Sequence, residues 1–208
     1  MSNLFIIAAP SGCGKTSLVE SLINDAKNLC VSISHTTRKP RVDEVNGTNY
    51  HFVSVSEFQK MVSEDLFIEH AEVFENFYGT SKKLINNNLD NNIDVILEID
   101  WQGARQVNQN LPSAISIFIL PPSKEALELR LRNRAQDDEL VIKKRMLDAE
   151  NQMSHYNEFD YLVINDDFNS ALTDLKSIIS SSNNLTKCAH LSLEEQSIKH
   201  KKLLKKLI

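Results

Sequence analysis

The stretch Leu4-Phe-Ile-Ile-Ala-Ala-Pro-Ser-Gly-Cys-Gly-Lys-Thr16 decides the fold of this chain. Residues 4–8 form a continuous apolar run that predicts a buried strand, and the glycines that follow turn the chain. Gly12 and Gly14 allow backbone angles that direct successive N–H groups inward around an anion. A helix that begins near Lys15 adds its positive N-terminal dipole at the same point. The stretch therefore predicts a phosphate-binding loop between a strand and a helix.

The side chains that end this loop indicate a nucleoside triphosphate as its ligand. At these offsets Lys15 would reach the β- and γ-phosphates, and the Thr16 hydroxyl can ligate Mg²⁺. The usual loop is glycine, four residues, then Gly-Lys-Ser/Thr, and here Ala9 takes the first position. A glycine-rich turn without a ligand would not explain the lysine and threonine. The residues of the predicted ATP-binding loop are Ala9, Pro10, Ser11, Gly12, Cys13, Gly14, Lys15 and Thr16.

Composition excludes several classes of function. With 23 basic and 28 acidic residues the net charge is −5, which argues against a broad nucleic-acid-binding surface. No apolar run approaches ~18 residues, so we expect no membrane span. The three cysteines lack a paired or metal-binding spacing, and without a recognisable signal peptide the expected location is the cytoplasm. Cys13, inside the loop, is either a small filler residue or a redox target.

Apolar strands alternate with amphipathic helices along most of the chain, and this order predicts an α/β fold with a parallel sheet flanked by helices. The expected core strands are residues 4–8, 30–34, 94–100, 115–120 and 160–165. The expected helices include residues 15–27, 56–63, 81–91 and 168–182. Residues 51–80 differ, because short strand-like stretches surround one short helix there. That segment indicates an inserted lobe of mixed sheet.

Two acidic residues are candidates for the site. Asp100 ends the strand 94–100 at the edge where parallel sheets bind ligands, a place where Walker-B acids contact substrate or Mg²⁺. Glu69 shares a strand face with Ala71 and Val73, which indicates an enclosed carboxylate that needs a partner. A surface glutamate is the alternative interpretation of Glu69.

Basic residues gather in two places. Arg38 and Arg41 flank a proline that stiffens the backbone, and they form either a phosphate-binding cluster or a solvated basic turn. Arg130 and Arg134 lie four residues apart and so share a helix face. They belong either to a lid that closes over a transferring phosphoryl group or to salt bridges with the acids of residues 137–139.

The C-terminal residues carry weaker signals. Ser192-Leu-Glu-Glu195 matches a capping box, and a lysine-rich stretch with spaced leucines follows it. We expect a solvated C-terminal helix, with packing against a partner as the alternative. The sequence leaves the oligomeric state open, a homo-oligomer included.

Taken together, these stretches resemble the bacterial type of guanylate kinases over about residues 2–184. The stretches that carry the resemblance are Ala9-Pro-Ser-Gly-Cys-Gly-Lys-Thr16, Val31-Ser-Ile-Ser-His-Thr-Thr-Arg-Lys-Pro-Arg41, Phe67-Ile-Glu-His-Ala-Glu-Val-Phe74, Tyr78-Gly-Thr-Ser81, Ile99-Asp-Trp-Gln-Gly103, Phe118-Ile-Leu-Pro-Pro-Ser123 and Ile164-Asn-Asp-Asp167. The resemblance implies transfer of the γ-phosphoryl group of ATP to GMP with Mg²⁺. It also implies a P-loop kinase core with an inserted mixed-β GMP-binding lobe and a helical lid.

The same resemblance divides the chain and assigns its residues. The implied segments are a core with the loop at 1–34, the GMP-binding lobe at 35–82, core at 83–122, the lid with flanking helices at 123–150, and core completion with a helical tail at 151–208. The implied GMP ligands are Ser34, Glu69, Thr80 and Asp100 at the base and Arg38, Arg41, Tyr50 and Tyr78 at the phosphate. The implied ATP contacts beyond the loop are Arg130 and Asn165. The implied catalytic cations are Lys15, Arg38, Arg134 and Arg145, with Thr16 as the metal ligand.

Departures from the family and rival functions complete the expectations. Ala135 stands where the family often has glycine, Glu98 where many members have aspartate, and Thr80 where some have serine; none removes a needed functional group. The first rival is a related kinase for another acceptor such as a ribose bisphosphate, and the second is a peptide-binding scaffold domain without catalysis. Glu69 beside Thr80 favours a guanine site over the first rival, and an intact Lys15 favours an enzyme over the second.

Overall fold

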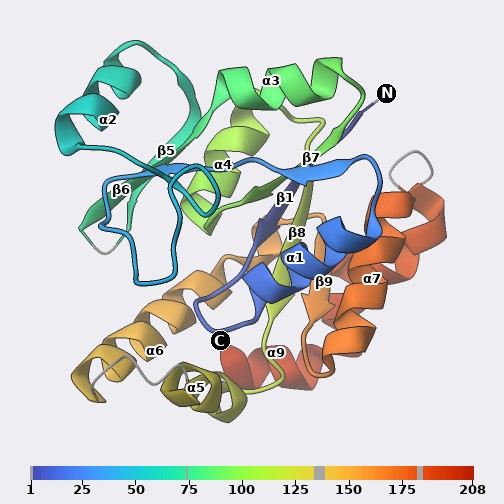
Figure 1. Cartoon of the computed structure of the whole chain (residues 1–208). Coiled ribbons are helices and arrows are strands. Elements are labelled where there is room, and N and C mark those ends of the chain that lie inside the picture. The colour runs from blue at the N-terminus through green and yellow to red at the C-terminus, as the bar shows by residue number, and fades with distance from the viewer. Residues whose placement is uncertain (1, 74, 134–138, 182–184) are drawn as a thin grey trace.

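The structure is a computed structural model of the chain that describes residues 2–73, 75–133, 139–181 and 185–208. A parallel core sheet lies at its centre, with the strand order β2-β7-β1-β8-β9 (Figure 1). Its strands are β1 (Leu4–Ala8), β2 (Leu29–Val31), β7 (Asp94–Glu98), β8 (Ile115–Leu120) and β9 (Tyr161–Ile164). All four neighbouring pairs run parallel, so the predicted parallel sheet is confirmed.

The apolar run at the start of the chain forms the middle of this sheet. β1 lies between β7 and β8, and all five of its residues are buried. A strand covered on both faces reads as continuous rather than alternating hydrophobicity, which explains the sequence of residues 4–8. The strand expected at 30–34 is shorter than predicted, because the chain leaves the core sheet after Val31 toward a second sheet. One further hydrogen bond ties the chain to the core sheet beyond Val31, from the Ser32 N–H to the Ile96 carbonyl oxygen at 2.9 Å.

Helices cover the core sheet. The helices around it are α1 (Lys15–Asp25), α3 (Lys82–Asp90), α4 (Trp101–Asn110), α5 (Lys124–Asn133), α6 (Glu139–Ser154) and α7 (Phe168–Ser180). Of these, α1 and α7 pack against each other along one face (Figure 1). α4 was not expected from the sequence. The strand expected at 94–100 ends at Glu98, and α4 begins at Trp101 because the Asp100 side chain caps it by accepting from the Gly103 N–H at 2.9 Å.

A second sheet with the order β4-β3-β6-β5 stands beside the core, at the upper left of Figure 1. Its strands are β3 (His35–Thr36), β4 (His51–Phe52), β5 (Phe67–Val73) and β6 (Asn76–Ser81). One pair is parallel and two are antiparallel, as expected of an inserted mixed sheet. The helix α2 (Val55–Ser63) packs on it through Phe58, which stacks on Phe67 and Phe77. All four strands fall within residues 35–82, and the exact segment boundaries stay a prediction.

The tail contains a 3₁₀ segment η2 (Leu185–Leu191) and the short helices α8 (Leu193–Lys199) and α9 (Lys201–Leu207). The expectation of a solvated C-terminal helix is wrong, because Leu204 and Leu207 are buried in the main hydrophobic core. The tail is also held to β9, where the Leu193 N–H donates to the Asp160 carbonyl oxygen at 2.9 Å. In the described part of the chain, none of the helices is both long and apolar enough to cross a membrane.

Candidate active site

The turn after β1 has the backbone that the sequence predicts. Gly12 and Gly14 have φ values of +91° and +84°, in the left-handed region that favours glycine. A Cβ at Gly12 would lie 2.9 Å from a Leu131 methyl group, and one at Gly14 would lie 2.8 Å from the Asn165 amide nitrogen. The backbone conformation therefore requires glycine at both positions, and a Cβ at either would also press on a neighbouring side chain. Gly14 also forms the N-cap of α1, so the loop ends at a helix N-terminus.

Two residues from distant segments hold the loop in place. The Asn165 amide nitrogen, at the end of β9, donates to the Cys13 carbonyl oxygen at 2.7 Å. Arg130, near the end of α5, donates through Nη2 to the Asn165 carbonyl oxygen at 2.8 Å. Within the described residues, the Nη1 atom of Arg130 is buried and has no hydrogen-bond partner. Arg130 thus brings an incompletely paired guanidinium beside the loop.

The environment of Cys13 decides between the two interpretations of that residue. Its side chain is fully buried in the hydrophobic core. Burial raises the pKa of the thiol to about 12, although the nearby cations Arg130 and Lys15 act in the opposite direction. Because the thiolate is the reactive form, a buried thiol with a high pKa is inert. The geometry therefore supports the filler interpretation over the redox target.

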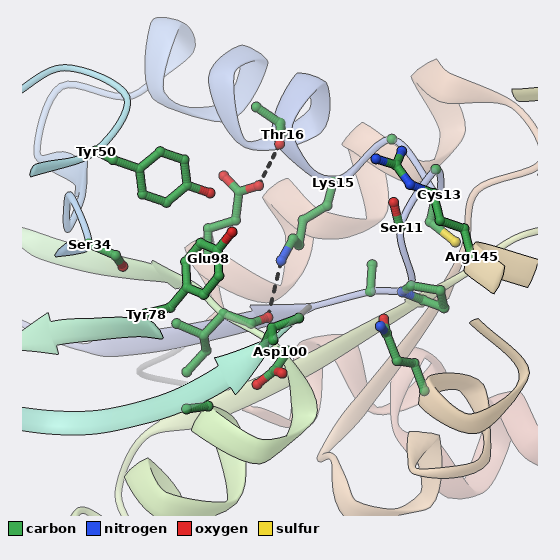
Figure 2. Close-up of a pocket in the computed structure, with 18 of the residues that line it drawn as sticks. Ser11, Cys13, Lys15, Thr16, Ser34, Tyr50, Tyr78, Glu98, Asp100 and Arg145 are labelled. Atoms are coloured by element: carbon green, nitrogen blue, oxygen red, sulfur yellow. Dashed lines mark hydrogen bonds between the residues drawn. The ribbon is translucent and has the colours of Figure 1, made fainter. Parts of the chain in front are cut away.

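The end of the loop meets the end of β7. The Lys15 ammonium donates to the Ile99 carbonyl oxygen at 3.1 Å, and the Thr16 hydroxyl donates to Glu98 Oε1 at 2.5 Å (Figure 2). Both side chains of the motif thus lie at the carboxyl edge of the parallel sheet, where α/β folds bind ligands. In the sequence Glu98 is only a departure from the family pattern, whereas in the structure it is the hydrogen-bond partner of Thr16.

A cavity of about 280 Å³ connects the loop to the second sheet and to α6. Figure 2 shows Tyr50, Tyr78 and Ser34 on one side of it and the loop on the other. The predicted site residues that line the cavity are Ala9, Pro10, Ser11, Gly12, Cys13, Gly14, Lys15, Thr16, Ser34, Arg41, Tyr50, Glu69, Tyr78, Asp100 and Arg145. Four predicted residues lie behind or beside the lining: Arg38, Thr80, Arg130 and Asn165. Arg134 lies outside the described residues, as does Ala135.

A chain of polar groups forms the end of the cavity next to β5 and β6. The Ser34 and Thr80 hydroxyl oxygens lie 3.0 Å apart, and the Thr80 hydroxyl donates to Glu69 Oε1 at 2.5 Å. Glu69 is 3% exposed, so the interpretation as a surface glutamate is wrong. The partner that an enclosed carboxylate needs is Thr80. Burial raises the pKa of the Glu69 carboxyl to about 7; the nearby Asp100 adds to this, while the Thr80 hydrogen bond opposes it.

The tyrosines and arginines of the second sheet form the other polar group. Tyr50 and Tyr78 pack edge to face with ring centroids 6.0 Å apart, and burial, reinforced by Glu98, raises the pKa of Tyr50 to about 12. Arg38 donates from both terminal nitrogens to Glu44, at 2.8 and 2.9 Å, and its guanidinium lies 5.4 Å from the Tyr50 ring centroid. This carboxylate, which the sequence did not single out, holds Arg38 directly behind the cavity wall.

The helix α6 adds side chains from the opposite side. Arg145, one of the expected catalytic cations, lines the cavity, and Gln152, which the sequence did not indicate, lines it too. Gln152 donates to the Asp148 carboxylate, and burial raises the pKa of Asp148. The residues 145, 148 and 152 recur at helical spacing, a signal that could have pointed to Gln152. The salt-bridge interpretation of this region holds for a different arginine, since Arg132 pairs with Glu128 at 2.7 Å and with Glu139 at 2.6 Å.

The glycine turn between β1 and α1 lies at the carboxyl edge of the parallel sheet, where α/β folds bind ligands, and one cavity joins it to the second, mixed sheet. The model of the guanylate kinase family matches residues 1–182. The chain belongs to the guanylate kinase family.

Individual relatives match along almost the full length. The guanylate kinase of Saccharophagus degradans is 53% identical over 205 residues, which cover 99% of this chain and 97% of that protein. The guanylate kinase of Shewanella denitrificans is 58% identical over 178 residues, which cover 85% of this chain and 86% of that protein. A crystal structure of guanylate kinase from Anaplasma phagocytophilum superposes with a TM-score of 0.73 at 30% identity and covers 98% of this chain and 96% of its own.

Proposed function

We infer that this protein is an ATP:GMP phosphotransferase that transfers the γ-phosphoryl group of ATP to GMP, giving ADP and GDP for guanine nucleotide metabolism and recycling. The observation that carries the inference is one cavity that joins the phosphate loop to a buried carboxylate, Glu69. ATP and GMP are the substrates, and the cytoplasm is the proposed location.

Recognition of the acceptor base rests on Glu69. Guanine presents two donors side by side, N1–H and the 2-amino group, and one carboxylate can accept from both. Thr80 already donates to Oε1 and so fixes the orientation of the carboxylate. Ser34 and Asp100 line the same end of the cavity and complete the proposed base site. Adenine offers an acceptor at N1, which the carboxylate repels.

The acceptor phosphate is assigned to the second sheet. Arg41, Tyr50 and Tyr78 line the cavity and supply donors there. Arg38 lies behind Tyr50, oriented by its bidentate pair with Glu44. Guanidinium groups suit phosphate because their fixed fork of donors matches its oxygens. Arg38 reaches the phosphate by exchanging part of its contact with Glu44 for the ligand.

The donor site is assigned to the loop and its supports. Backbone N–H groups of residues 9–16 surround the triphosphate, and Lys15 offsets charge on the migrating group. Arg130 and Asn165 lie on the ATP side of the loop, and Arg145 on α6 faces the region where the two nucleotides meet. Arg134 adds a further cation in this assignment. Phosphoryl transfer needs no general base, because the attacking phosphate oxygen is already ionised.

Mg²⁺ fits the residues at the end of the loop. The Thr16 hydroxyl and the Glu98 carboxylate present hard oxygen donors within 2.5 Å of each other. The described residues contain no group of three acidic, histidine or cysteine side chains that could hold a metal alone. Mg²⁺ usually binds through few protein oxygens together with substrate phosphates, and the two oxygen donors of Thr16 and Glu98 suit this mode of binding. When bound, the ion neutralises charge that develops on the phosphates.

One experiment tests the function and its main residue. ADP release from ATP·Mg²⁺ is measured with GMP, AMP, CMP and UMP offered separately, for the wild type and for Glu69→Gln. We expect turnover with GMP, and at least a tenfold lower kcat/KM for GMP in the variant, because a charged hydrogen bond of ~1.5–3 kcal/mol is lost. The gap between GMP and AMP should narrow as well. A folded variant that uses GMP as well as the wild type would remove Glu69 from the base site.

A further inference from the structure

The helix α4 packs against β5, the strand that carries Glu69 (Figure 1). β5 is an edge strand of the second sheet, and amide side chains of α4 occupy part of its open edge. Gln106 accepts from the His70 N–H at 3.1 Å and donates to the His70 carbonyl oxygen at 2.8 Å. Asn110 donates to the Ile68 carbonyl oxygen at 3.1 Å. The residues on both sides of Glu69 are therefore fixed to one helix.

The same helix face approaches the Glu69 side chain at Gly103. A Cβ built at Gly103 would lie 2.5 Å from Glu69 Oε2 and 3.1 Å from its Cδ. Real Cβ atoms do not approach a carboxylate this closely, so a side chain at position 103 would displace the carboxylate or the helix. A displaced carboxylate would have to move into the cavity that it lines or give up the hydrogen bond from Thr80 to Oε1, and either movement changes where Oε2 lies.

The backbone of Gly103 gives no other reason for a glycine. Gly103 is the third residue of α4, and its φ does not lie in the left-handed region. Within a helix, glycine is less favourable than alanine, because it loses more conformational freedom on folding. Glycine at position 103 therefore makes the helix less stable than alanine would, and the Glu69 carboxylate occupies the space that a Cβ would fill.

We propose that Gly103 is a positioning residue that determines base specificity by leaving room for the Glu69 carboxylate at the start of α4. The proposal rests on the role of Glu69 in the proposed function. Gly103 contacts neither substrate directly; it acts by fixing where Glu69 Oε2 lies relative to the guanine edge. Since the two guanine donors need both carboxylate oxygens, a displaced Oε2 loses one of them.

The test is the Gly103→Ala variant, with Gln109→Ala as the matched control. Gln109 is exposed on the same helix, so its replacement also raises helix propensity without approaching Glu69. We expect Gly103→Ala to lower kcat/KM for GMP at least tenfold, mainly through KM, and to leave KM for ATP within twofold. Inosine monophosphate lacks the 2-amino group, so the preference for GMP over it should shrink too. The control should keep the wild-type values.

A double-mutant cycle separates positioning from general damage. In Glu69→Ala there is no carboxylate to displace, so adding Gly103→Ala should change kcat/KM for GMP by less than twofold and raise the melting temperature. If Gly103→Ala alone does not fold but the double variant does, the steric conflict with Glu69 is established and the proposal stands. Equal losses in both backgrounds, wild-type use of GMP, or a matching rise in KM for ATP would each overturn it. If Glu69→Gln loses activity with GMP while Gly103→Ala keeps the wild-type kcat/KM for GMP, only the role of Gly103 is rejected. If Glu69→Gln itself keeps the wild-type kcat/KM for GMP, the proposed base site is rejected.

Discussion

Glu69 should set a pH dependence that runs in opposite directions for stability and for GMP use. Its carboxyl has a pKa of about 7 in the folded protein, against an ordinary value of 4.5. Between these two values the folded state holds a proton that the unfolded state has lost. The free energy of unfolding therefore falls as pH rises through this window, and the stability lost is regained below it.

The magnitude follows from the separation of the two pKa values. At ~1.4 kcal/mol per pKa unit, ionising the buried carboxyl costs about 3 kcal/mol above pH 7, of which about 2 to 3 kcal/mol is lost between pH 5 and pH 8. The Glu69→Gln variant carries no such titration. Relative to the wild type, this variant should gain about 2 to 3 kcal/mol in the free energy of unfolding over the same pH interval.

GMP use should follow the ionised fraction in the other direction. The carboxylate must be ionised to accept from two guanine donors, and its ionised fraction rises roughly tenfold between pH 6 and pH 8. The ratio of kcat/KM for GMP in the wild type to that in Glu69→Gln should therefore rise by about tenfold. Taking the ratio cancels titration of the GMP phosphate itself, which has a pKa near 6 in both reactions.

Two measurements check this reasoning. Urea unfolding of both proteins without nucleotide, at pH 5, 6, 7 and 8, gives the stability difference, and initial rates with GMP at pH 6 to 8 give the activity ratio. A stability difference that stays constant from pH 5 to pH 8 would refute the assignment of a buried, titrating carboxyl. A constant activity ratio with a changing stability difference would refute the role of the carboxylate in binding GMP.

Two further outcomes are expected. Lys15→Ala should lower kcat by about 10²-fold or more, because it removes an electrostatic contact to the migrating phosphoryl group, and wild-type turnover in a variant with an unchanged urea midpoint would contradict the assignment. Leu207→Ala should lower the free energy of unfolding by about 2–5 kcal/mol, because the Leu207 side chain is fully buried. The control Ile198→Ala, at a position 68% exposed, should change it by no more than ~0.5 kcal/mol. Equal effects of the two substitutions in urea unfolding would mean that the tail does not complete the core.

Local chemistry allowed the sequence to determine the core and the loop. A buried parallel strand needs a continuous apolar run, and residues 4–8 and 115–120 supplied it. The left-handed backbone at Gly12 and Gly14 excludes most other residues, so the turn could be predicted from its glycines alone. Resemblance then brought together site residues that lie far apart in the chain, such as Ser34 and Asp100.

The tertiary structure decided everything that depends on contacts between distant segments. Burial of Glu69 comes from α4 and β6 packed around it, and a period-two pattern can indicate an enclosed face but not the partner or the pKa. In the sequence Gly103 is one residue of the Ile99–Gly103 stretch, and only the structure places the Glu69 carboxylate of β5 against it. The sequence does not indicate which surface the leucines of the tail pack against. An amphipathic pattern predicts that one helix face is buried, but only the fold supplies the surface that covers it.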